Sequence, residues 1–184
     1  MPSFFKAVEK ELRQYDIHFV GLKTGEHDFD YHIDDKFFKL FETSLFEKGM
    51  CDVHLKLDKQ TAHFELGFSI EGNVEVDCDR CTAMLNYPIF NKVKLYIKFD
   101  DERNEVEENE NDEVIYIARA DSSFNVAQVI YEYISLSVPM VKNCDYLEER
   151  FKNCNQEILK KLNNSAAPEK TDDRWQGLKN IKID

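Results

Sequence analysis

The sequence predicts an α+β protein in which a strongly twisted antiparallel β-sheet packs with one or two C-terminal helices. Apolar and polar residues alternate through most of the first half, which is the period of a strand with one buried face. In the second half, apolar residues recur at helical spacing. The 184 residues are 42% hydrophobic and include 14 Phe and 8 Tyr, enough for one sizeable core. Periodicity leaves an open sheet and a barrel-like sheet as alternatives.

The first elements of the chain read as two strands and a short helix. Alternation predicts strands over residues 17–21 and 27–33. Asp34 and Asp35 then precede an apolar segment ending at Phe41 and have the composition of an acidic N-cap. We therefore expect a short helix after the second strand.

The best-supported element is a three-stranded meander over residues 51–78. Alternation covers residues 51–57, 64–70 and 74–78. The connection Asp58–Thr61 is short enough for a hairpin, and Gly72-Asn73 is typical of a second tight turn.

Further strands are predicted over residues 93–99 and 114–118, on either side of an acidic run. We expect them to form a second hairpin with the acidic run at its tip.

Two helices are predicted in the second half. The first runs from Val126 to Leu136 and stops before Pro139, with Asn125 and Gln128 spaced as a capping box. The second begins at Asp145 and carries its apolar stripe as far as Leu162.

The chain is expected to form a single α+β domain over residues 1–163, with an acidic loop at 100–113. Residues 164–184 read as a linker followed by a C-terminal segment that contains Trp175, the only tryptophan. A buried or partner-bound aromatic anchor is the expected use of this side chain.

Charge is concentrated in the acidic loop. The chain holds 24 basic and 36 acidic side chains, a net charge of −12, and residues 100–113 contain nine carboxylates and one arginine. Such a run is typical of a solvated loop, and it also suits attraction of a basic protein. The absence of a basic stripe argues against autonomous binding of RNA. The predicted partner-contact residues are Asp100, Asp101, Glu102, Glu107, Glu108 and Trp175.

Four of the five cysteines are candidates for a metal site. Cys78 and Cys81 form a C-x-x-C at the end of a strand, while Cys144 and Cys154 are separated by nine residues, wider than the usual ligand spacing. The alternatives are a pair of inert structural cysteines and a thiol-redox site, although Asp79 inside the motif opposes a lowered thiol pKa. No cofactor is expected, with zinc on these four cysteines as the alternative.

Other chemistry has no support in the sequence. Phosphate-binding glycine loops, a G-x-S-x-G nucleophile and an H-E-x-x-H metal motif are all absent. No apolar run is long enough to span a bilayer, and the charged N-terminal residues do not suit a signal peptide. We therefore expect a cytoplasmic protein that is not an enzyme, has no small-molecule substrate and does not associate with membranes.

Residues 72–81, 129–139 and 173–179 lie in the same order as three sequence signatures of a known family, and together they resemble the YceD family, the large ribosomal RNA subunit accumulation proteins. Residues 72–81 (GNVEVDCDRC) are similar to its G-x-V-x-V-x-C-x-R-C signature. Residues 129–139 (VIYEYISLSVP) are similar to its helix with a central Glu that runs into L-x-L-P, and residues 173–179 (DRWQGLK) resemble its closing D-P-R-W-x-x-L.

The resemblance implies a bacterial, non-enzymatic factor that supports accumulation of 23S ribosomal RNA and assembly of the large subunit. Contacts with a basic ribosomal protein or an assembly intermediate fit the negative charge. A direct RNA contact through Tyr87, Tyr96 and Arg80 is the alternative. Arg80, Glu132 and Pro139 are expected to have structural roles, and whether Arg80 and Glu132 form an ion pair stays open.

Overall fold

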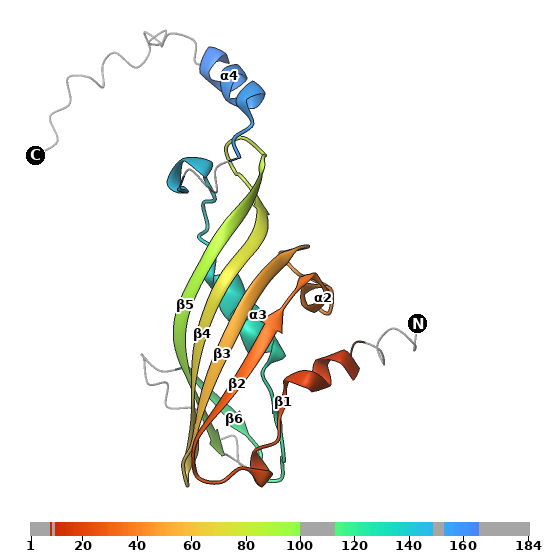
Figure 1. Ribbon diagram of the computed structural model, residues 1–184, viewed down its shortest axis with the longest axis vertical. Helices are drawn as coiled ribbons and strands as arrows, with labels where there is room; N and C mark the ends of the chain where they lie inside the picture. The colour runs from red at the N-terminus through yellow and green to blue at the C-terminus, as the bar shows by residue number, and fades with distance from the viewer. Residues whose placement is uncertain (1–7, 9, 100–112, 149–152, 166–184) are drawn as a thin grey trace, which may run out of the picture.

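The computed structural model describes residues 8, 10–99, 113–148 and 153–165. These residues form an open five-stranded sheet of order β2-β3-β4-β5-β6, with helix α3 (Ala127–Ser137) across one face (Figure 1). The predicted α+β class is confirmed. The sheet does not close, because its edge strands β2 and β6 do not pair with each other. The division of the chain at residue 163 stays a prediction.

Most of the sheet is an antiparallel meander. Its strands are β2 (Gly25–Ile33), β3 (Gly49–Lys59), β4 (His63–Asp77), β5 (Met84–Phe99) and β6 (Glu113–Ile117). Strands β2 to β5 pair antiparallel, whereas β6 pairs parallel to β5. The predicted second hairpin is therefore wrong, because parallel neighbours need a crossover connection and not a hairpin turn. Residues 100–112, which make that connection, lie outside the described residues.

The predicted turn at Gly72-Asn73 is also wrong, because β4 continues through both residues, so residues 51–78 form a two-stranded hairpin and not a three-stranded meander. Gly72 pairs with Cys51 and has a φ of +159°. A Cβ at this position would stand 2.2 Å from the Met50 carbonyl oxygen and 2.5 Å from the Cys51 Cα. The glycine therefore serves close approach of two strands and not chain reversal.

The core lies between α3 and the inner face of the sheet. Alternate residues of the central strands, including Leu55, Leu66 and Leu95, are completely buried, as the period-two pattern predicts. From α3, Ile130 and Ile134 are also completely buried. Burying one such aliphatic side chain contributes roughly 1.5–3 kcal/mol.

Hydrogen bonds hold helix α3 at its N-terminus and at Tyr133, near its middle. Asn125 Oδ1 accepts a hydrogen bond from Ala127 N at 3.0 Å, while its Nδ2 donates to Leu12 O at 2.8 Å. Gln128 does not return to Asn125, as a capping box would require, and donates to Glu132 Oε1 at 2.7 Å. The helix ends at Ser137, before Pro139, as predicted. Near the middle of the helix, Tyr133 Oη donates to the Glu113 carboxylate of edge strand β6 at 2.7 Å.

A two-stranded sheet of β1 (Asp16–Ile17) and β7 (Phe124–Asn125) precedes α3. The predicted strand at residues 17–21 gives way after Ile17 to a 3-10 helix, Phe19–Gly21 (η2), and another 3-10 helix, Arg13–Tyr15 (η1), precedes β1. Helix α2 (Asp35–Phe38) follows β2, and the Asp34 carboxylate accepts from the N–H groups of its first turn, as predicted.

The predicted second C-terminal helix is shorter than expected. Residues Cys144–Tyr146 form a 3-10 helix (η3), and α4 (Gln156–Ser165) begins eleven positions after the predicted start at Asp145. Asn143 and Asn155 explain the break. The side chain of each accepts a backbone N–H from the helix that follows it, so each residue starts a separate helix.

We predict that Gly72→Ala destabilises the protein by about 2–3 kcal/mol, because the new methyl group would collide with backbone atoms of β3 that cannot rotate away. Gly67→Ala is the matched control, since its Cβ would meet only Lys56 O, at 3.9 Å. Urea unfolding measures both variants. Equal free energies of unfolding for Gly72→Ala and the unmodified protein would contradict the close approach.

A second prediction concerns Tyr15 and Tyr31, whose rings pack 5.4 Å apart. Burial is the main reason why the pKa of each phenol rises from 10.0 to about 12. The negative charge of Asp34 raises the pKa of Tyr15 further, and the charge of ionised Tyr15 raises the pKa of Tyr31 further. The protonated form is therefore favoured by folding, so the stabilisation is complete below pH 10 and is lost as pH rises through about 12.

Denaturant titrations at pH 9 and pH 11.5 test this dependence. We expect a smaller loss of unfolding free energy in the double variant Tyr15→Phe/Tyr31→Phe than in the unmodified protein. The same loss in both proteins would show that these two phenols do not contribute.

Candidate functional site

The cysteine motif lies at the tip of the hairpin that joins β4 to β5. Cys78 N donates to Ala83 O, and Thr82 N donates to Cys78 O, each at 2.9 Å. Thr82 adopts a φ of 53°, which completes the reversal of the chain. Cys78 and Cys81 are thereby held in one tight turn, both buried.

The structure brings the other two predicted cysteines to the same turn. The Sγ atoms of Cys78, Cys81 and Cys144 lie within 4.8 Å of one another, and the Cys81–Cys144 separation is 3.9 Å. Cys154 lies just before α4, with its Sγ 2.7 Å from that of Cys144. The wide sequence spacing of Cys144 and Cys154 is thus compatible with proximity, because η3 and the segment before α4 fold back onto the hairpin tip.

Backbone N–H groups point at the clustered sulfurs. Burial of the Cys78 thiol raises its pKa, but the N–H groups of Cys81, Cys144 and Arg80 donate to it, and together they lower the pKa to about 7. Burial raises the pKa of Cys144, and contacts with neighbouring thiols raise it further. Asn155 N donates to Cys81 Sγ at 3.4 Å.

Polar contacts also hold the hairpin tip against the segment that follows α3. Asp79 N donates to Lys142 O at 2.8 Å, and Lys142 N donates to the Asp79 carboxylate at 2.6 Å. Arg80 forms an ion pair with Asp145. The open question of an Arg80–Glu132 pair is settled by this contact, since Arg80 reaches Asp145 and Glu132 accepts from Gln128.

The hairpin tip is a poor site for thiol-redox catalysis. Such use requires a thiol at a helix N-terminus after a strand, with access to a substrate. Cys78 follows a strand but enters a turn between antiparallel strands, and only 1% of its surface is exposed. Cys78 shares the C-x-x-C spacing, the position after a strand and a lowered pKa with redox cysteines, but it lacks the helix N-terminus and the access to a substrate.

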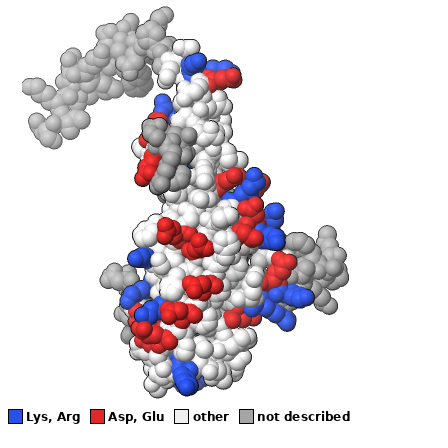
Figure 2. All heavy atoms as spheres, in the orientation of Figure 1, with Lys and Arg blue, Asp and Glu red and all other residues white. Residues whose placement is uncertain are grey.

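A second feature, not singled out from the sequence, is a set of carboxylates on the outer face of the sheet. Side chains of β2 and β3 that point away from α3 place Asp28, Asp30 and Asp52 together, with 61%, 83% and 81% of their side chains exposed. Figure 2 shows carboxylates along the middle of this face. The alternation predicted that these residues face solvent, but only the strand register shows that they are neighbours.

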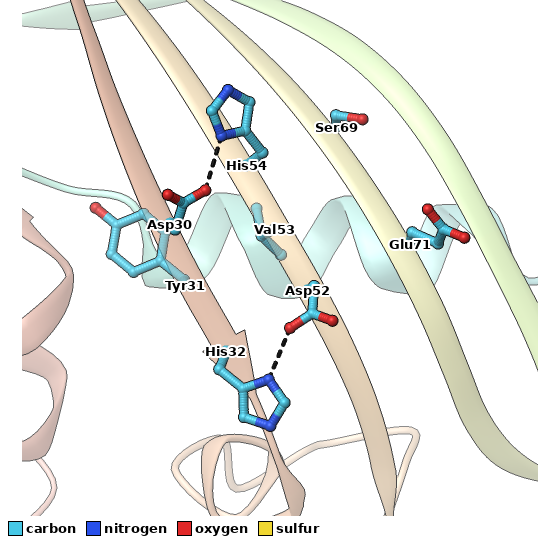
Figure 3. A pocket seen from close by; sticks show the side chains of 8 residues that line it. All are labelled: Asp30, Tyr31, His32, Asp52, Val53, His54, Ser69 and Glu71. Atoms are coloured by element: carbon cyan, nitrogen blue, oxygen red, sulfur yellow. Dashed lines mark hydrogen bonds and ion pairs between the residues drawn. The ribbon is translucent and has the colours of Figure 1, made fainter.

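Two histidine–carboxylate pairs lie in a shallow hollow of this face (Figure 3). His54 Nδ1 is 2.7 Å from Asp30 Oδ1, and His32 Nδ1 is 2.7 Å from Asp52 Oδ1. Glu71 lines the hollow from β4. We name Asp28, Asp30, Asp52 and Glu71 the acidic sheet face.

The structure does not assemble the RNA platform considered above. Tyr87 pairs with buried Val74 and packs against the core, whereas Tyr96 pairs with Glu65 on the opposite face of the sheet. Arg80 lies at the hairpin tip, paired with Asp145. These three side chains therefore do not form one continuous surface.

The predicted acidic contact residues 100–108 and Trp175 lie outside the described residues. Among the described helices, none is long and apolar enough to cross a membrane.

These observations define an α+β protein with an acidic sheet face and a cysteine cluster at one hairpin tip. Comparison with protein families matches residues 66–182, more than half of the chain, to YceD, described as large ribosomal RNA subunit accumulation protein YceD. The chain belongs to the YceD family. The match confirms the resemblance noted in the sequence and includes all four clustered cysteines. Neither a curated protein nor a solved structure matches the chain.

Proposed function

We propose that this protein is a non-enzymatic ribosome biogenesis factor of the bacterial cytoplasm. It supports accumulation of 23S ribosomal RNA and assembly of the large subunit by contacting a basic ribosomal protein or a pre-ribosomal particle. Membership of the YceD family is the observation that carries this proposal, since the family is described by large-subunit ribosomal RNA accumulation.

The charge distribution supports a basic protein as the partner. The net charge is −12, and the acidic run at 100–113 contains nine of the carboxylates. The acidic sheet face adds a negative surface among the residues that the structure describes. Ribosomal proteins are rich in Lys and Arg because they bind RNA, and a negative surface attracts them over about one Debye length, ~8 Å at physiological salt.

The proposed contact elements are therefore of two kinds. The sequence supplies Asp100, Asp101, Glu102, Glu107, Glu108 and the aromatic anchor Trp175. The folded sheet supplies Asp28, Asp30 and Asp52, which are exposed and held in fixed register by the pairing of β2 with β3. A rigid arrangement of charges loses little entropy when a partner binds.

We predict that the triple variant Asp28→Asn/Asp30→Asn/Asp52→Asn binds large-subunit proteins about tenfold more weakly than the unmodified chain. The factor follows from about 0.5 kcal/mol for each exposed charge pair lost. The measurement is affinity capture of isolated large-subunit proteins at several salt concentrations.

A second variant neutralises the five carboxylates at positions 100, 101, 102, 107 and 108 and is measured in the same way.

The matched control is Glu11→Gln/Glu42→Gln/Glu47→Gln, which removes the same charge from exposed sites outside the sheet. It should retain binding. Retention of every ribosomal protein by both acidic-surface variants would contradict the proposed contact. Tight binding to large-subunit RNA stripped of protein would instead favour the RNA-contacting alternative.

One observation on the outward face of β5 supports the alternative of direct RNA contact. On the outward face of β5, Phe90 is 68% exposed and the Lys92 ammonium lies 5.6 Å from its ring centroid. Tyr96 lies farther along the same face of the strand. An aromatic ring beside a cation is the type of group on which an unpaired base stacks.

A further inference from the structure

A groove with an apolar lining lies beside the C-terminal end of α3, and the proposed function gives it no role. It has a volume of about 420 Å³, which is within the range of pockets that bind small molecules. Its walls come from the loop after α2, from the end of β4 and from the chain that follows α3. The apolar lining residues are Leu45, Phe46, Val76, Val138, Pro139 and Met140. We name this hollow the apolar groove.

The apolar groove presents large apolar side chains to solvent from a fixed backbone. Leu45 is 73% exposed and Met140 is 97% exposed, whereas Phe46 and Val76 are buried in the core. Leu45 N donates to Tyr131 Oη of α3 at 2.9 Å, which holds the loop in place. An apolar surface that is exposed and held rigid beside the core is typical of a site that another segment covers.

Carboxylates stand at the rim of the apolar groove. Asp77 lines it from the end of β4, and Asp79 lines it from the hairpin tip. Lys142 offsets the charge of Asp79, since its ammonium is 3.5 Å from that carboxylate. Asp77 therefore leaves a net negative charge at the rim. An apolar segment that carries basic residues is the occupant that complements this surface.

The chain itself contains a segment of this composition after α4. Residues 174–182 (RWQGLKNIK) hold three basic residues and no acidic one, in a chain whose net charge is −12. Trp175 and Leu178 are three positions apart, so a single helical turn would present both on one face. A Trp side chain that becomes covered buries roughly 150–250 Å² of surface. Residues 166–184 lie outside the described residues.

The chain after α4 is long enough to bring Trp175 to the apolar groove. Helix α4 is about 15 Å long and starts beside the tip of the β4–β5 hairpin (Figure 1). The tip is tied to the groove, because Asp79 N donates to Lys142 O at 2.8 Å. The residues from Ser165 to Trp175 span up to about 33–36 Å when extended, more than twice the length of α4. A tethered segment also binds at an effective concentration in the millimolar range, which favours it over a free partner of equal affinity.

We propose that residues 174–178 dock in the apolar groove of the same chain, where the Trp175 ring lies between Leu45 and Met140. Arg174 then meets the carboxylates of the rim. The docked segment ties the chain after α4 to the end of α3, and it covers apolar surface that the described residues leave exposed. Docking belongs to the free protein, so Trp175 serves as the partner anchor of the proposed function only after it leaves the groove.

The test is the fluorescence of Trp175, which reports on this segment alone because the chain has no other tryptophan. The sample is the purified full-length chain without ribosomal components, so the result is independent of the proposed function. We expect emission at shorter wavelength than in the urea-unfolded chain. Quenching by acrylamide should be several-fold weaker than in the unfolded chain, because a docked ring is shielded from water.

The double variant Leu45→Lys/Met140→Lys tests the groove. Both side chains are exposed, so the fold should tolerate the changes, and the new charges oppose both the Trp175 ring and Arg174. We expect emission and quenching to move to the values of the unfolded chain. The matched control is Val20→Lys/Phe90→Lys, which adds the same charge at exposed apolar sites outside the groove and should leave both readings unchanged. Circular dichroism checks that both variants fold.

Emission and quenching of the unmodified chain equal to those of the unfolded chain would overturn the proposal. An equal response of the groove variant and its control would do the same. Shielding that increases with protein concentration would place Trp175 in the groove of a second copy and contradict docking within one chain. Shielding that arises only after addition of large-subunit proteins would make a ribosomal partner the occupant, and it would equally contradict the proposal.

Discussion

The long antiparallel pairing of β4 with β5 is the constraint on which the rest of the structure depends. The register runs without interruption from His63 opposite Lys98 to Asp77 opposite Met84. The middle of this ladder carries the buried face on which α3 packs, with Phe68 of β4 against Tyr133 and Asn91 of β5 hydrogen-bonded to Ser137. One end carries the turn that holds Cys78 and Cys81. A slip of one residue would turn both the core and the cysteine turn to the wrong side of the sheet.

This pairing separates three environments along one sheet. The inner face is apolar and covered by α3, the outer face carries carboxylates on β2 and β3, and the hairpin tip holds the buried sulfurs. Each environment has a different consequence. The inner face stabilises the fold, the acidic sheet face is the surface proposed for a basic partner, and the buried sulfurs lie where the hairpin tip meets η3 and the residues before α4.

The sequence predicted those features that depend on local pattern. Alternation identified β3 and the first part of β4, and helical spacing identified α3 with nearly correct ends. One prediction failed at Gly72, because a glycine required by close strand packing looks the same in the sequence as a glycine in a turn. The other failed at β6, because the residues of a strand do not show whether it pairs parallel or antiparallel. The four cysteines could be proposed together, but only the path of the chain through η3 shows that Cys154 reaches Cys144.

Removal of this chain from the cells that make it, followed by measurement of the ratio of 23S to 16S ribosomal RNA, tests the central claim most directly. The account predicts a fall in that ratio, with a deficit of large subunits in sucrose gradients, and recovery when the unmodified chain is restored. An unchanged ratio and a normal gradient profile in cells shown to lack the protein would contradict a role in large-subunit RNA accumulation.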